Sequence, residues 1–220
     1  MIARDLISNN IPPLKTTDTG EKALNWMSDF HVSHLPIIDN QTFIGLISED
    51  DILNLNSPEL PIHANPLSLR MPFIHSEEHI YEVIKKMVQL QLSVIPVIEN
   101  EKTYIGLITA ESLLNYFAQS ASLQQPGGVL ILEIQSRDYS MSEIARLVES
   151  EGASVLSSLV TSRPDAYKVE VTLKVNRQNL AGIISTFKRF NYEVKASFQE
   201  NDYFNTLKNR YDSFMNYLNV

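Results

Sequence analysis

Residues 34–48 read HLPIIDNQTFIGLIS, and residues 94–109 read VIPVIENEKTYIGLIT, so the first half of the chain repeats one pattern. The prolines Pro36 and Pro96 are 60 residues apart, whereas the glycines Gly45 and Gly106 are 61 apart. The second copy has therefore gained one residue in the turn between its two β-rich runs. A unit that occurs only twice, at a period longer than most solenoid repeats, predicts two half-domains packed face to face with a cleft between them.

Each copy predicts a helix, a strand, a short turn, a strand and a second helix. In the first copy the strands are expected over 31–39 and 43–47. His31 and His34 would then lie on one strand and point to opposite faces, and with no third ligand in the pattern no metal site is predicted. A connector over 57–72 carries four prolines, which disfavours a long helix. We expect the first repeat to span 1–60 and the second 61–123.

The remainder of the chain predicts a different fold. After a break at 124–128, apolar periodicity predicts the order βαββαβ over residues 128–200, which is the ferredoxin-like arrangement. Large apolar residues then recur at helical spacing through the C-terminal segment, residues 201–220, and predict an amphipathic helix that its own domain or a partner chain would cover. The whole chain is therefore expected to be of the α/β (α+β) class.

Composition narrows the function. The 220 residues include no cysteine, no apolar run long enough for a membrane span and no secretory signal, so we expect a cytoplasmic protein without membrane contact. The net charge of −8 lies in residues 1–125, where 7 Lys and Arg face 15 Asp and Glu. The absence of a basic stripe disfavours nucleic-acid binding. No glycine-rich phosphate loop and no nucleophile beside a base is recognisable, so an enzyme is not expected.

The repeat, over roughly residues 1–120, resembles a tandem pair of CBS (cystathionine-β-synthase) domains, the unit called a Bateman module. Residues 128–200 resemble an ACT domain in their order of elements, and the combination is similar to regulatory proteins of the acetoin-utilisation type. The resemblance implies a non-catalytic sensor that binds an adenosine-containing ligand such as AMP, ATP or S-adenosylmethionine in the cleft of the pair. We expect a homodimer, and since no effector domain is recognisable we expect the output to pass through a separate protein target, which the sequence does not identify.

The ribose and phosphate motif of that family is glycine, two apolar residues, Ser or Thr, two residues, and Asp. The first copy keeps it whole with Ser48 and Asp51, whereas the second has Thr109 but Ser112 in place of the aspartate. A hydroxyl at a helix start can face a phosphate, and a carboxylate can accept both hydrogen bonds of a ribose diol. Besides Ser48, Asp51 and Thr109, the resemblance implies ligand contacts from the strands of both copies: His34, Leu35, Pro36, Val94, Ile95 and Pro96.

Other interpretations remain open. Ser48 and Asp51 also form the pattern of a helix capping box, and a cap and a ligand could use the same helix end. The acidic balance favours a neutral, cationic or magnesium-bound ligand over a free polyphosphate. The first turn of the ACT-like part, residues 136–140, has no glycine; Asp138 could hold an amino group there, or the turn could be an ordinary polar one in a domain that serves dimerisation. The alternative function is a scaffold or protein-interaction dimer with no bound nucleotide.

Overall fold

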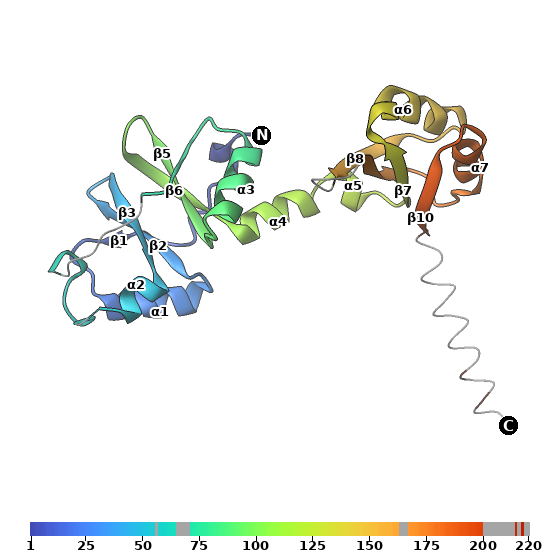
Figure 1. Ribbon diagram of the computed structural model, residues 1–220. Coiled ribbons are helices and arrows are strands. Elements are labelled where there is room, and N and C mark those ends of the chain that lie inside the picture. Colours follow the sequence, from blue (N-terminus) through green and yellow to red (C-terminus); the bar gives the residue numbers. More distant parts are fainter. Residues whose placement is uncertain (56, 65–70, 163–166, 200–213, 215–216, 218–220) are drawn as a thin grey trace. The chain divides into compact units, whose positions relative to one another are not determined.

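The computed structural model describes residues 1–55, 57–64, 71–162 and 167–199, together with residues 214 and 217. The chain divides into two compact units, Met1–Phe117 and Ala118–Val220. Each unit has its own sheet, drawn separately in Figure 1.

The first unit contains the same five-element series twice. The first series is β1 (Leu14–Lys15), α1 (Gly20–Phe30), β2 (His34–Asp39), β3 (Thr42–Ser48) and α2 (Glu49–Leu53). The second series is β4 (Ile74–His75), α3 (Ile80–Gln89), β5 (Val94–Glu99), β6 (Thr103–Thr109) and α4 (Ala110–Ala118). Short 3₁₀ turns precede them at Ala3–Leu6 and Ile62–Ala64.

The sheet of this unit is symmetric about its middle. Its strand order is β1-β2-β3-β6-β5-β4, and the two halves meet where Thr42 of β3 pairs antiparallel with Thr103 of β6. The register repeats as well, because Leu14 pairs with Ile37 in the first half and Ile74 with Val97 in the second. The duplication seen in the sequence is therefore a duplication of strand pairing, residue for residue.

The expectation that His31 lies on a strand is wrong. His31 does not lie on a strand: it ends α1 in the left-handed conformation, with φ of 54°, and β2 begins at His34. The backbone N–H of His31 donates to carbonyls of the last helical turn, which fixes it as a cap. Gln91 has the equivalent conformation, with φ of 53°, just after α3.

The two halves exchange their leading segments. Ala3 and Leu6 belong to the buried cluster of the second half, and the N–H of Ser8 donates to the carbonyl of Leu107 at 2.8 Å. Conversely, Ile62 lies in the buried cluster of the first half, and its N–H donates to the carbonyl of Asp18 at 2.8 Å. Each half is thus completed by the segment that precedes the other half in the sequence.

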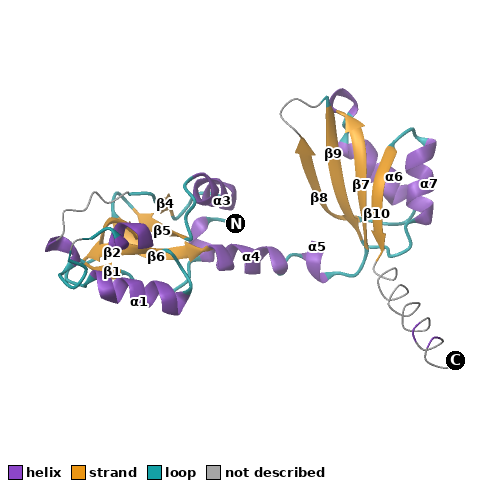
Figure 2. Cartoon of the chain, turned by 60° about the horizontal axis from the view of Figure 1, so that its bottom comes forward, coloured by secondary structure: helices purple, strands orange, loops and turns teal. Residues whose placement is uncertain are grey.

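The second unit has the expected ferredoxin-like fold. Its elements are β7 (Gly128–Gln135), α6 (Met141–Ser150), β8 (Val155–Ser162), β9 (Lys168–Val175), α7 (Ala181–Arg189) and β10 (Glu193–Gln199), and a short α5 (Ala121–Gln124) precedes them. The antiparallel sheet has the order β10-β7-β9-β8, and both long helices cover one face of it (Figure 2). Alternate residues of β7 point into the core against these helices: Leu130, Leu132 and Ile134. The helix expected over 201–220 lies outside the described residues, apart from Phe214 and Tyr217.

Candidate functional site

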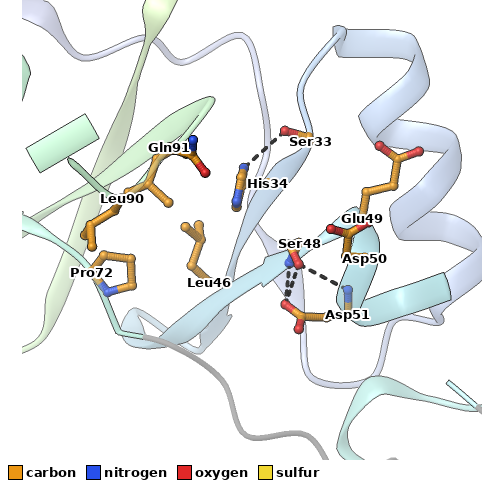
Figure 3. A pocket seen from close by; sticks show the side chains of 11 residues that line it. Ser33, His34, Leu46, Ser48, Glu49, Asp50, Asp51, Pro72, Leu90 and Gln91 are labelled. Atoms are coloured by element: carbon orange, nitrogen blue, oxygen red, sulfur yellow. Dashed lines mark hydrogen bonds between the residues drawn. The ribbon is translucent and has the colours of Figure 1, made fainter. Parts of the chain in front are cut away.

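A cavity of about 340 Å³ lies in the first unit where β3 ends and α2 begins. Both repeats contribute to its walls, as Figure 3 shows. The first repeat supplies Ser33, His34, Leu46, Ser48, Glu49, Asp50 and Asp51, and the later part of the unit supplies Pro72, Leu90, Gln91 and Leu92. The cavity therefore joins the motif predicted in the first copy to residues around the second.

The start of α2 is closed by a reciprocal cap. The backbone N–H of Asp51 donates to Ser48 Oγ at 3.1 Å, and the backbone N–H of Ser48 donates to Asp51 Oδ2 at 2.9 Å. The Ser48 hydroxyl also donates to Oδ2 at 2.6 Å (Figure 3). The capping interpretation is thereby confirmed, and both bonds to the carboxylate go to Oδ2, one of its two oxygens. Oδ1 of the exposed Asp51 side chain is left to accept hydrogen bonds from outside the cap.

The equivalent end in the second repeat has the same geometry without a charge. The backbone N–H of Ser112 donates to Thr109 Oγ1 at 2.9 Å, the N–H of Thr109 donates to Ser112 Oγ at 3.1 Å, and the two hydroxyls are 2.7 Å apart. Ser112 thus replaces the aspartate as a cap, although it cannot replace its negative charge. Thr109 is buried and does not line the cavity.

His34 links the cavity to the second repeat. Its Nδ1 lies 3.2 Å from Ser33 Oγ and 3.2 Å from Ser93 Oγ, and the backbone N–H of Ser93 donates to it at 3.4 Å. Ser33 and Ser93 are themselves equivalent in the two copies, and the N–H of Ser33 donates to Ser93 Oγ at 3.0 Å. Because Nδ1 accepts a backbone hydrogen bond, the neutral ring carries its proton on Nε2. A displacement of the His34 ring would therefore also displace Ser93, which directly precedes β5.

Of the predicted contact residues, the cavity brings together His34, Ser48 and Asp51. Leu35, Val94 and Ile95 are fully buried core residues. The two strand prolines, Pro36 and Pro96, are buried too and do not line the cavity. The lining residues that the sequence did not single out include Ser33, Pro72 and the turn Leu90–Leu92.

The lining is acidic. Glu49, Asp50 and Asp51 stand together at the start of α2, and the lining residues within the described part of the chain include no lysine or arginine. A negative first turn agrees with the partial positive charge of a helix start. The described residues contain no cluster of three or more His, Cys, Asp or Glu suited to a metal ion. Among the helices described, none has the length and apolarity needed to cross a bilayer.

The model of the CBS domain family matches residues 3–57 and 67–119. The chain carries a tandem pair of CBS domains. The matched ranges coincide with the two series of elements in the first unit. The cavity described above is therefore a cavity of the CBS pair.

Among curated proteins, homoserine O-acetyltransferase from Methanobrevibacter ruminantium is 22% identical over 113 residues. That match takes in 51% of this chain but 23% of the relative, so the chain spans about a quarter of the length of this relative. The acetyltransferase activity is named for that relative, and a match over 23% of its length does not extend it to this chain.

Solved structures with CBS domains are also similar. A CBS domain pair/ACT domain protein from Thermotoga maritima is 19% identical with a TM-score of 0.48, covering 55% of this chain and 99% of that one. The protein CBSX2, solved in complex with AMP, is 19% identical with a TM-score of 0.45, covering 54% of this chain and 96% of that one. Membership of the second unit in the ACT family stays a prediction that rests on its βαββαβ order.

Proposed function

We propose that this protein is a non-catalytic regulatory protein whose CBS pair binds an adenosine-containing ligand of the AMP, ATP or S-adenosylmethionine type. The observation that carries the proposal is the cavity at Ser48 and Asp51, where the intact motif of the first repeat meets residues around the second. Its volume of about 340 Å³ lies within the range of small-molecule pockets. The second repeat lacks the carboxylate, so we assign the ligand to the first.

The chemistry of the walls supports this assignment. The Asp51 carboxylate has an oxygen outside the cap, which can accept hydrogen bonds from a vicinal diol such as that of ribose. Leu46, Leu90 and Leu92 provide apolar surface against which a flat base can pack. Because three acidic residues line the same cavity, a neutral, cationic or magnesium-bound ligand is favoured over a free polyphosphate.

The regulatory step follows from the position of the cavity. A ligand that contacts residues of both repeats shifts their packing only if it binds one arrangement more tightly than another. His34 is placed to transmit such a shift, because it contacts Ser93 of the second repeat. We extend the proposal to a cytoplasmic homodimer that acts on a separate protein target.

The test is a thermal-shift series with AMP, ADP and ATP, each with and without magnesium, and with S-adenosylmethionine, NAD and free amino acids. A ligand at a hundred times its dissociation constant adds about 2.7 kcal/mol to the free energy of unfolding. The decisive variant is Asp51→Ser, which retains a reciprocal hydroxyl cap like that of Thr109 and Ser112 but removes the carboxylate.

The matched control is Ser112→Ala, which removes the equivalent cap residue from the second repeat. We expect a shift with one adenosine compound that Asp51→Ser abolishes and Ser112→Ala retains. A shift that survives in Asp51→Ser contradicts the assigned site, and a shift with an amino acid alone would move the site to the second unit. No shift with any compound would favour the scaffold function.

A further inference from the structure

In the second unit, the long helices α6 and α7 leave one face of the sheet uncovered. Helices α6 and α7 lie together on one side of it (Figure 2). The opposite side, here called the open face, presents the residues of β7 that alternate with its core residues, and their cross-strand neighbours. Its apolar members are Val129, Ile131, Leu159, Ala196 and Phe198.

These residues form one continuous patch. Ile131 is paired with Ala196 on one side and with Thr172 on the other, and Thr172 is paired with Leu159. Phe198 is paired with Val129 in the adjoining row. Directly paired residues project to the same face of a sheet, so the patch extends across all four strands. None of its five apolar members belongs to the core cluster of the unit.

The patch is exposed in the single chain. The exposed fraction is 62% for Leu159 and 57% for Phe198. Of the charged residues beside it, Lys168 is paired with Glu133 and Lys195 with Glu170. Lys174, the cross-strand neighbour of Val129, donates instead to the carbonyl of Gly127 at 3.4 Å. A partner could therefore cover the apolar centre at Ile131 and Leu159 without burying Lys168 or Lys195 as an unpaired charge.

The sequence of the C-terminal segment predicts an apolar surface of matching length. In the C-terminal segment the residues Phe204, Leu207, Tyr211, Phe214, Met215 and Leu218 recur at helical spacing. Twenty residues as a helix span about 30 Å, and a strand of 8 residues such as β7 spans about 26 Å. The segment follows directly after β10, whose Phe198 is part of the open face.

The exposure of this segment points to the occupant. Phe214 is 59% and Tyr217 80% exposed, and these are the two residues of the segment that the structure describes. One chain thus offers both an uncovered sheet face and an uncovered aromatic surface. Two copies related by a twofold axis can cover both pairs of surfaces at once, because such an interface is reciprocal.

We propose that the open face binds the C-terminal segment, residues 201–220, of a second copy of this chain. The contact occurs twice in the dimer, and each copy supplies one face and one segment. This interface rests on the homodimer of the proposed function. It is independent of the ligand site proposed for the CBS pair, so the ligand site and the interface can each fail without the other.

The first experiment measures the mass of the full chain by light scattering after size exclusion, over a range of concentrations. A single chain has a mass of 25.0 kDa, and we expect twice that value. A face variant, Leu159→Lys with Phe198→Lys, and a segment variant, Leu207→Lys with Phe214→Lys, should each raise the dissociation constant of the dimer at least about 30-fold. The matched control is Tyr167→Lys, which adds a lysine to the same unit at a side chain that is 90% exposed.

The second experiment mixes the two variants. The face variant has an intact segment and the segment variant an intact face, so one of the two reciprocal contacts can still form. We expect the mixture to contain a heterodimer of the two variants, although each variant alone is monomeric at the same concentration. A monomeric full chain, a dimer that both variants retain, or a mixture without a heterodimer would each overturn the proposal; the last result would mean that the segment covers its own sheet.

Discussion

Replacing Gly106 by alanine should destabilise the CBS pair through its N-terminal segment. Gly106 has φ of +150°, a conformation that other residues rarely adopt, and a Cβ added there would collide with Cγ2 of Ile7. The backbone strain costs about 1–3 kcal/mol, and the overpacking costs a further 1–3 kcal/mol or so. We therefore expect Gly106→Ala to lower the free energy of unfolding by about 2–6 kcal/mol.

Urea unfolding followed by tryptophan fluorescence can measure this loss, because the only tryptophan, Trp26, packs against the core of the first half of the CBS pair. Ile7→Ala separates the two causes. Ile7 is partly buried against the core of the second half, so its own truncation should cost about 1–2 kcal/mol.

In the Ile7→Ala background the collision is absent, and Gly106→Ala should then cost only the backbone strain, about 1–3 kcal/mol. An equal cost of Gly106→Ala in both backgrounds would show that Ile7 does not press on this strand. A cost below about 1 kcal/mol in the natural background would refute the whole argument.

Three further predictions concern the CBS pair. Without ligand, Asp51→Ala should lower the free energy of unfolding by about 1 kcal/mol, because the two hydrogen bonds from Ser48 to the carboxylate are lost while the bond to Ser48 Oγ remains. Asp51→Ser should cost less than half of that, since a hydroxyl can close the cap; equal losses in urea unfolding would contradict this second part. Ile95→Ala should lower the free energy of unfolding by about 2–5 kcal/mol because the side chain is fully buried. It should leave the dissociation constant of the proposed adenosine ligand unchanged in equilibrium dialysis; weaker binding would instead place Ile95 in the site. Burial raises the pKa of Asp18, but hydrogen bonds from Lys22 and from the backbone N–H of Lys15 outweigh this effect and hold the pKa below its usual value. The contribution of the Asp18 carboxylate to stability is therefore present above about pH 4 and is lost as the pH falls through the lowered pKa. Asp18→Asn should accordingly be less stable than the natural protein at pH 7 and differ less from it at pH 3; a difference that grows on acidification would contradict the sign.

The duplicated fold could be predicted because its signal is local and occurs twice. The apolar runs around Pro36 and Pro96 are long enough to define strands, and an equal spacing implies an equal register. The exchange of leading segments could not be predicted. Ala3 and Leu6 pack against strands and helices more than 70 residues away, and no periodicity in their short stretch indicates which half they will complete.

The site was predictable only in part, for a related reason. Ser48 and Asp51 belong to a compact motif in which the cap itself fixes both side chains. Leu35 and Ile95 lie in strands buried on both faces, where alternation cannot tell which residues reach a cavity and which fill the core. The contribution of Leu90 depends on the meeting of the two halves, which is a tertiary event without a local signal.

The two halves of the CBS pair share a fold but differ in chemistry at the positions of the proposed ligand site. The cap at Ser48 contains a carboxylate, whereas the cap at Thr109 consists of two hydroxyls. His34 has Val94 as its counterpart, so only one of the two sides has an imidazole at the start of the strand. A symmetric fold needs equivalent packing residues in both halves, and it has them in the repeated strand register. The polar differences are not required by that packing, since both caps close equally well. They are therefore better explained by a ligand that binds one side, and His34, through Ser93, gives that side a direct contact with the other.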